Sequence, residues 1–302
     1  MSDATRNSGA RSDQDAGLVG RLSIVATPIG NLEDITLRAL STLRSAALVL
    51  AEDTRRTRAL LTRHGISART QALHAHTPPA SLVRLVELLE GGAHLALVTD
   101  AGTPLVSDPG AQLVQLAVER GIVVEPIPGA SAVTAALTAA AVPFASFRFA
   151  GFVPRTASAR RQWLARIADD EEACVFFESP QRLAGTLGEL ATQLAPERVV
   201  AVCRELTKLH EEVVRGTASE LAARFVDGAR GEITVVVGAG PKATRQDEAD
   251  ALPSIESRIA ALLAQGLSTK DVARTLVKER GGSRRELYAQ VQAVALAKRS
   301  PD

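Results

Sequence analysis

The stretch Val98–Gly110, VTDAGTPLVSDPG, decides the fold of this chain. A short apolar run enters it, and a helical pattern over residues 111–120 leaves it. Gly102 and Gly110 allow sharp turns and a close approach to a bound molecule. In open α/β sheets, ligands bind at loops that follow the carboxyl ends of strands. The stretch therefore predicts a strand, a binding loop and a helix, the alternative being a rigid turn in which Asp108 caps the helix.

The composition is that of an aliphatic, nearly neutral chain. Its 302 residues suggest one large or two medium domains, and 46% of them are hydrophobic although only 3% are aromatic. The formal net charge is +1. The chain as a whole is therefore no general polyanion binder, and contact with a nucleic acid requires a local basic patch.

Several features favour a soluble cytoplasmic protein. Cys174 and Cys203 each lie in an apolar run and are expected to be reduced core residues. Residues 1–18 lack the apolar segment of a signal peptide, and no apolar run is long enough to span a bilayer. The five histidines do not have metal-ligand spacing, so we expect no metal site.

Alternating strand and helix patterns predict a first α/β domain over residues 21–142, after a disordered tail over residues 1–20. Asp34 and Ser81 are expected to cap two of its helices. The predicted strands cover residues 21–27, 46–51, 71–76, 95–98 and 122–125. Helices are expected between them and in the alanine-rich segment before Pro143.

A change of period after Pro143 indicates a second α/β domain over residues 143–240. A polar linker, residues 241–253, then leads to three short helices in a module spanning residues 254–302. This module carries basic side chains at positions 270, 274, 278, 280, 284 and 285. Contact with RNA and a merely solvated helical face are both open interpretations of these charges.

Three familiar ligand-binding motifs are absent from the sequence: the dinucleotide-binding glycine pattern, the Walker-type phosphate loop and the nucleophile elbow. What remains is a set of strand-end loops at residues 28–34, 52–55, 100–110 and 129–132. In a doubly wound sheet such loops converge on one rim. Their small residues and carboxylates suit a neutral or cationic small ligand that has ribose and amine groups.

Five separate segments carry a family resemblance, at residues 23–36, 51–55, 99–110, 128–132 and 203–208. Together, and collinearly from residue 22 to 240, they resemble the ribosomal RNA small subunit methyltransferase I family. That family belongs to the tetrapyrrole-methylase-like class of S-adenosylmethionine enzymes. The resemblance implies two α/β domains, with a parallel N-terminal sheet and a mixed C-terminal sheet, and a small C-terminal helical module. It also implies S-adenosylmethionine bound in the cleft between the domains.

The same resemblance implies a reaction and partners. The reaction is 2'-O-methylation of a cytidine ribose in the decoding region of small-subunit rRNA, within the small ribosomal subunit, by a homodimer. Carried over position by position, the cofactor contacts are expected at Ile29, Asp100, Thr103, Ser131, Ala132, Phe177, Cys203 and Glu232. Relatives that methylate small molecules have a glycine-rich first loop, which residues 28–31 replace here.

A ribose hydroxyl is a poor nucleophile, so a positioned base or polarising group is expected. Glu52 and Asp53 are the favoured candidates because they follow a strand end with Arg55 beside them, and Arg55 could bind a neighbouring phosphate. Asp53 could instead simply cap the next helix. The other rim carboxylates considered are Glu33, Asp34 and Glu205.

Two rival functions remain open at this point. One is a small-molecule methyltransferase of the same fold, acting on a tetrapyrrole-like substrate. The other is an RNA-binding module without enzymatic activity. The basic C-terminal module favours RNA over a small molecule, and the intact loop from Asp100 to Gly110 favours an enzyme.

Overall fold

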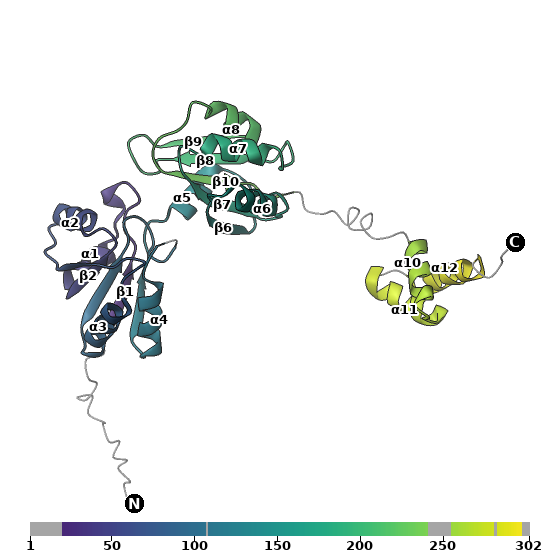
Figure 1. The fold of residues 1–302 in the computed structure, drawn as a ribbon, viewed down its shortest axis with the longest axis horizontal. Coiled ribbons are helices and arrows are strands. Elements are labelled where there is room, and N and C mark those ends of the chain that lie inside the picture. Colours follow the sequence, from purple (N-terminus) through teal and green to yellow (C-terminus); the bar gives the residue numbers. More distant parts are fainter. Residues whose placement is uncertain (1–19, 107, 241–254, 281–282, 298–302) are drawn as a thin grey trace, which may run out of the picture. The chain divides into compact units, whose positions relative to one another are not determined.

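The computed structural model describes residues 20–106, 108–240, 255–280 and 283–297. The chain divides into two compact units, residues 1–240 and 241–302 (Figure 1). The tail expected up to residue 20, apart from Gly20 itself, and the linker expected over residues 241–253 lie outside the described residues.

The first sheet is parallel, with the strand order β3-β2-β4-β1-β5. Val25 at the end of β1 pairs with Val98 of β4 on one side and Ile127 of β5 on the other, so three strands end level at one rim. The strands are β1 (Arg21–Val25), β2 (Leu48–Ala51), β3 (Thr70–Ala72), β4 (His94–Val98) and β5 (Val123–Ile127). This is the sheet that the strand–helix alternation predicts.

Helices cover both faces of this sheet (Figure 1). One apolar core joins Leu22 and Leu97 to α3 (Pro79–Glu90) and α4 (Ala111–Glu119). A second core joins strand residues of opposite orientation, including Val25 and Val98, to α1 (Leu37–Ser45) and α2 (Thr54–Arg63). Because helices cover both faces of the sheet, each strand is buried on both sides. This explains why the strands appear in the sequence as nearly continuous apolar runs.

The second sheet is mixed, with the order β6-β7-β10-β8-β9. Only β6 and β7 run parallel, and the other neighbours are antiparallel. The strands are β6 (Phe147–Phe152), β7 (Ala173–Glu178), β8 (Val200–Arg204), β9 (Glu212–Gly216) and β10 (Ile233–Val237). The parallel first sheet and mixed second sheet confirm the fold class expected from the resemblance.

Helices α6 (Ala157–Ala168), α7 (Leu183–Ala191) and α8 (Ala218–Arg224) share a core with one face of the second sheet. The other face packs against α5 (Ala132–Ala140) through Ala136, Val175 and Val236. The alanine-rich helix therefore follows the first sheet along the chain but is buried against the second. This packing ties the strand-end loop before α5 to both sheets.

The C-terminal unit contains α10 (Ile255–Ala264), α11 (Thr269–Arg280) and α12 (Arg284–Ala297). Ile259, Val272, Leu276 and Val291 are buried together in its small core. The three predicted helices are therefore confirmed. Gly281 and Gly282, which punctuate them in the sequence, lie outside the described residues.

Two predicted helix caps are wrong. Asp34 lies in the 3-10 turn η1 (Leu32–Asp34), and the hydroxyl of Thr36 caps α1 instead by accepting a hydrogen bond from the amide of Ala39. Helix α3 begins at Pro79 rather than after Ser81, because proline has the φ angle of a first helical turn and needs no amide partner there. Asp108 is not the cap of α4 either, because Gly110 occupies the N-cap position with a φ of 120°.

Both cysteines are buried and unpaired, as the sequence predicts. Burial raises the pKa of each thiol, Cys174 and Cys203, to about 11. Within the described ranges, no helix has the length and apolar character needed to cross a membrane.

Candidate active site

The loops that follow β1 and β4 are joined at the rim of the first sheet. Thr27 donates its amide to the carbonyl of Gly102 at 2.9 Å, and the amide of Gly102 donates to the carbonyl of Thr27 at 3.0 Å. The Thr27 hydroxyl also donates to the carbonyl of Thr99 at 3.1 Å. Gly102 has a φ of +84°, a conformation that glycine adopts without strain. These bonds hold the two central strand-end loops in one rigid frame.

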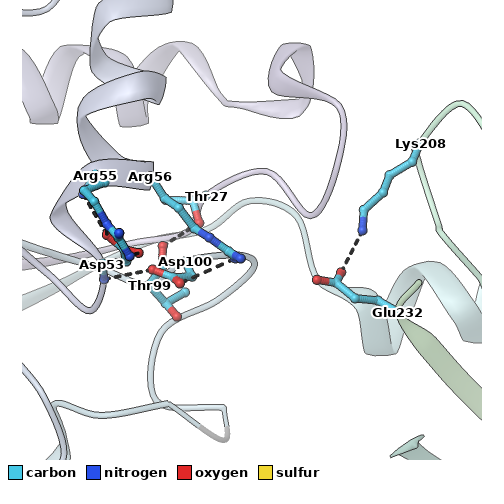
Figure 2. A network of polar contacts seen from close by, with 8 residues as sticks. All are labelled: Thr27, Asp53, Arg55, Arg56, Thr99, Asp100, Lys208 and Glu232. Carbon is cyan, nitrogen blue, oxygen red and sulfur yellow. Dashed lines mark hydrogen bonds and ion pairs between the residues drawn. The ribbon is translucent and has the colours of Figure 1, made fainter. Parts of the chain in front are cut away.

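Asp100 lies directly beyond β4 and faces the loop after β2 (Figure 2). Its Oδ1 accepts a hydrogen bond from the amide of Asp53 at 2.9 Å. Its Oδ2 lies 3.5 Å from Nη1 of Arg56. The carboxylate is thus oriented by two groups from the neighbouring strand end, and its remaining lone pairs are available to a ligand.

Asp53 is the N-cap residue of α2. Its side chain therefore caps this helix, which is the second of the two roles that the sequence left open for it. Its Oδ1 accepts a hydrogen bond from the amide of Arg55 at 2.8 Å, and its Oδ2 accepts from Nη2 of Arg55 at 2.8 Å. These bonds hold the pKa of Asp53 well below its usual range. A carboxylate held so acidic is a poor proton acceptor.

Asp108 has the opposite character. Burial raises its pKa, the nearby carboxylates of Glu52 and Asp100 raise it further, and the nearby polar side chain of Thr99 works against this. Glu52, Asp53, Asp100 and Asp108 therefore gather at the ends of two neighbouring strands. Such a group of carboxylates creates a local negative field that attracts a cationic ligand.

The third part of the rim is the N-terminus of α5. Thr103 donates its hydroxyl to the carbonyl of Ala130 at 3.3 Å, which ties the loop after β4 to this helix. Ser131 occupies the N-cap position, but its side chain makes no capping hydrogen bond. First-turn amides of a helix lack intrahelical acceptors, so those of α5 can bind a carboxylate or another acceptor on a ligand.

Four of the expected cofactor residues share one apolar cluster: Ile29 from the first loop, Ala132 from α5, Phe177 from β7 and Cys203 from β8. Cys203 is fully buried, and its Sγ lies 3.8 Å from the carbonyl oxygen of Ala136. Its thiol is therefore used in packing against α5. We call this cluster the apolar wall. It joins the loop after β1 of the first sheet to α5 and to strands of the second sheet.

The loop after β8 interlocks with the loop after β1. Thr207 accepts a hydrogen bond on Oγ1 from the amide of Asn31 at 3.0 Å. At Gly30 a Cβ atom would lie 2.5 Å from Cγ of Lys208, so the first loop needs glycine there. Glu205 and Thr207 have positive φ angles of 52° and 66°, which is uncommon for residues with a side chain.

Lys208 connects Glu232, the last of the expected cofactor residues, to this loop (Figure 2). Its Nζ lies 2.8 Å from Oε1 of Glu205 and 3.0 Å from Oε2 of Glu232. Hydrogen bonds from Lys208 lower the pKa of Glu205. Glu232 stands at the start of β10 and remains largely exposed.

The structure thus collects the expected site residues in three linked groups. The first group is formed by the carboxylates of Glu52, Asp53 and Asp100 together with Arg55. The second group is α5 with the apolar wall, and the third is the loop after β8, whose Lys208 binds Glu232. Sequence reasoning did not single out Thr27, Arg56, Thr207 and Lys208 as site residues. Thr27, Thr207 and Lys208 lie in segments that carry the family resemblance, whereas the signal for Arg56 is its position just beyond a strand end.

The chain matches known proteins in sequence. The family model "Tetrapyrrole (Corrin/Porphyrin) Methylases" matches residues 21–222. A protein of Mesorhizobium japonicum named "Ribosomal RNA small subunit methyltransferase I" is 45% identical over 272 residues, covering 89% of this chain and 90% of the relative. A protein of the same name from Mycobacterium tuberculosis strain H37Rv is 42% identical over 276 residues, covering 90% of this chain and 94% of its own length.

Solved structures share the fold. A cobalt precorrin-4 methyltransferase superposes with a TM-score of 0.57 at 20% identity, covering 72% of this chain and 94% of that one. A uroporphyrin-III-C-methyltransferase from Thermus thermophilus superposes with a TM-score of 0.52 at 22% identity, with the same coverage of 72% and 94%. At this identity the likeness speaks for the fold alone.

Fold, rim and family model together define the class: a methyltransferase of the tetrapyrrole methylase type, with S-adenosylmethionine as methyl donor. Within that class, the chain belongs to the ribosomal RNA small subunit methyltransferase I family.

The residues at the rim fit this methyl donor. S-adenosylmethionine carries a cationic sulfonium and an ammonium group, for which the carboxylate group around Asp100 is a complementary environment. Its own carboxylate matches the uncapped N-terminus of α5. Its adenine and ribose match the apolar wall and the nearby hydroxyl and backbone groups.

Proposed function

We propose that this protein methylates the 2'-hydroxyl of a cytidine ribose in the decoding region of small-subunit rRNA, with S-adenosylmethionine as donor. The observation that carries the proposal is the extent of the sequence match. The family model ends at residue 222, whereas the match to the M. japonicum relative takes in 89% of the chain. The similarity to proteins named as rRNA methyltransferases is thus not limited to the fold shared with tetrapyrrole methylases.

The proposed partner is the small ribosomal subunit, approached by a homodimer in the cytoplasm. Exposed basic side chains on the C-terminal helices, including Lys270, Arg274, Lys278, Arg284 and Arg285, supply a local positive surface on a chain of net charge +1. Phosphate contacts of this kind position a protein on RNA without specifying sequence.

For the donor we propose contacts from all three groups at the rim. Asp100 and Thr103 hold the amino-acid or ribose part, and Ser131 and Ala132 contact it from the start of α5. Ile29 and Phe177 contact it from the apolar wall, with Cys203 contributing through its backbone since the thiol packs on α5. Glu232 contributes from the loop held by Lys208.

When bound, S-adenosylmethionine supplies a methyl group made electrophilic by the sulfonium. The chain has to hold the acceptor oxygen in line, about 3 Å from that carbon, and exclude water. It also has to accept the hydroxyl proton. We propose Glu52 for this role rather than Asp53, because Arg55 holds the Asp53 carboxylate in its weakly basic state. Arg55 is largely exposed although it pairs with Asp53, and we propose that its remaining N–H groups bind a phosphate next to the target.

The test is transfer of labelled methyl groups from S-adenosylmethionine into small ribosomal subunits that lack the modification. Alkaline hydrolysis of the recovered rRNA locates the product, because a 2'-O-methyl group blocks cleavage of the adjacent phosphodiester. One alkali-resistant cytidine in the decoding region is the expected result. Label on a nucleobase, or transfer to a tetrapyrrole-like acceptor in place of the subunit, would contradict the proposal.

A further inference from the structure

Three phenylalanine rings form a continuous row on one face of the second sheet. The ring centroid of Phe177 lies 5.0 Å from that of Phe149 and 5.3 Å from that of Phe152. Phe149 and Phe177 pack against the apolar wall that includes Ile29. Phe152 is 61% exposed, although the chain has only seven phenylalanines, one tryptophan and one tyrosine. The row thus leads from the donor site to an aromatic ring in solvent.

A β-bulge in β6 places Phe152 in this row. Phe149 pairs with Val175 and Phe152 pairs with Phe177, so three steps along β6 correspond to two along β7. Gly151 accommodates the extra residue with a φ of +70°. In a regular strand Phe152 would share a face with Ala150, which packs in the core on the opposite side of the sheet.

The bulge therefore places Phe152 beside Phe177 with most of its ring in solvent. Burying a phenylalanine side chain is worth about 1.5–3 kcal/mol relative to leaving it exposed, so a ring in this position contributes little to the stability of the fold. Bulges next to active sites re-aim side chains in this way. An exposed ring at the edge of a candidate active site suits a ligand with an aromatic face.

The surroundings of Phe152 match RNA. Phe152 and Phe177 stand at the carboxyl ends of the two parallel strands, and Phe177 is one of the residues proposed to contact the donor. Arg155, three residues further along, is exposed and makes no ion pair with any side chain that the structure describes. An aromatic ring followed by a free cation is the combination that binds an unstacked base and its phosphate.

We propose that Phe152 is the stacking platform for a base of the RNA substrate, at or next to the methylated nucleotide, and that Arg155 binds an adjacent phosphate. The proposal rests on the proposed function, since it gives that reaction a substrate-positioning residue. It requires a target that is single-stranded when bound, because a base in a duplex offers no free face.

The experiment compares methyl transfer into unmodified small subunits by the full-length wild type, Phe152→Ala, Phe152→Trp and Phe152→Leu. Phe147→Ala is the matched control, because Phe147 is 43% exposed on the same strand at its opposite end. Phe152→Ala should raise KM for the subunit roughly ten-fold, within the range measured for base stacking on aromatic side chains. Phe152→Trp should stay near wild type, and Phe152→Leu should resemble Phe152→Ala.

Affinity for S-adenosylhomocysteine, measured by calorimetry, should be the same in all five proteins. An unchanged KM in Phe152→Ala, or full rescue by Phe152→Leu, would overturn the proposal. So would a change of oligomeric state in Phe152→Ala by sedimentation, because the ring would then belong to an interface between copies of the chain. If the wild type itself transfers no methyl group to the subunit, the proposed function fails, and this inference falls with it.

Discussion

At the scale of single residues, three carboxylates beyond the ends of β2 and β4 differ in what surrounds them. Asp53 is bound by Arg55, and Asp100 is bound by the amide of Asp53 and by Arg56. Asp108 is partly buried beside like charges. The neighbours of each carboxylate, rather than its residue type, therefore decide what it can do in the site. Variants that each remove one carboxylate charge can separate these functions.

The first prediction concerns the proton acceptor. Glu52→Gln should lower kcat by roughly 10²–10⁴-fold, the usual contribution of a positioned base, and leave S-adenosylhomocysteine affinity unchanged. Asp53→Asn should have a much smaller effect on kcat, because asparagine retains the cap of α2. Single-turnover methyl transfer measures both. Equal losses in the two variants would contradict the assignment.

A second prediction concerns donor binding. Asp100→Ala removes an oriented acceptor and leaves donor groups on the bound ligand without a partner, which costs about 1–3 kcal/mol. Its S-adenosylhomocysteine affinity should fall accordingly, roughly 5- to 150-fold. Calorimetry measures this, with KM for the ribosomal subunit at saturating donor as the control. Wild-type affinity in the variant would remove Asp100 from the donor site.

A third prediction concerns pH and His94, which lies at the far end of β4 from the rim. Burial lowers the pKa of His94 and the charge of Arg21 lowers it further, while hydrogen bonding and Glu125 work against this. The hydroxyl of Ser23 lies 2.9 Å from its Nε2. The unfolded chain therefore binds a proton at a higher pH than the folded chain does. Stability contributed by neutral His94 is complete above the unfolded pKa of about 6.5 and is lost as the pH falls below it.

The variant His94→Gln has no such group to titrate. The stability difference between wild type and His94→Gln should therefore shrink between about pH 7 and about pH 5.5. Urea unfolding at a series of pH values measures this difference. A difference that stays constant or grows with acidification would contradict a lowered pKa at His94.

At the scale of elements, one buried arginine joins a helix end to a strand end. Arg198 donates Nε to the carbonyl of Gly238 at 2.7 Å and Nη1 to the carbonyls of Ile167 and Ala168 at 3.0 and 2.8 Å. Its Nη2 donates to the carbonyl of Asp170 at 2.9 Å. The guanidinium thus supplies donors to carbonyls at the end of α6 and just beyond β10, two of which, those of Ile167 and Asp170, also accept a backbone amide.

The fourth prediction follows from these contacts. Arg198→Met should destabilise the protein by about 2–4 kcal/mol, because the carbonyls of Ala168 and Gly238 lose the donor that Arg198 supplies. Arg198→Lys should recover only part of this loss, since an ammonium group cannot reproduce the planar fork. Urea unfolding gives the free energies. Arg166→Met, an exposed position on α6, serves as the control and should change stability by less than about 0.5 kcal/mol.

Strand and helix positions follow closely from the sequence because their cause is local. Apolar runs mark the strands, and Asp53 caps α2, which is one of the two roles that the sequence leaves open for it. The misplaced caps at Asp34 and Ser81 have equally local causes, in competition between neighbouring capping groups. The bulge at Gly151 escapes such reasoning, because pairing with β7 defines it.

At the scale of the whole molecule, the chain contains one unit with the proposed donor site and a second unit that carries basic helices. The carboxylate group, α5 and the loop after β8 all belong to the first unit. We therefore expect the two units to contribute different steps, donor binding in one and affinity for the ribosomal subunit in the other.

The fifth prediction tests this division. A chain ending at residue 252 lacks all three helices of the C-terminal unit. It should keep wild-type S-adenosylhomocysteine affinity and bind small subunits more weakly, with a reduced dependence of binding on salt because fewer phosphates are neutralised. Filter binding across a salt series measures the change. Unchanged affinity and salt dependence would show that the basic helices face away from the RNA.

The sequence by itself determined which segments become strands and helices, where the strand-end loops lie, and which family the chain resembles. These properties depend on local patterns of apolar, capping and turn residues, and on motifs that are contiguous along the chain. The tertiary structure alone decided that α5 is buried against the second sheet, that the amide of Asp53 binds Asp100, and that Thr207 binds the first loop. It also placed Phe152 in a row with Phe177. Contact partners decide these properties, and the strand pairing and helix packing that bring partners together join residues far apart in the sequence.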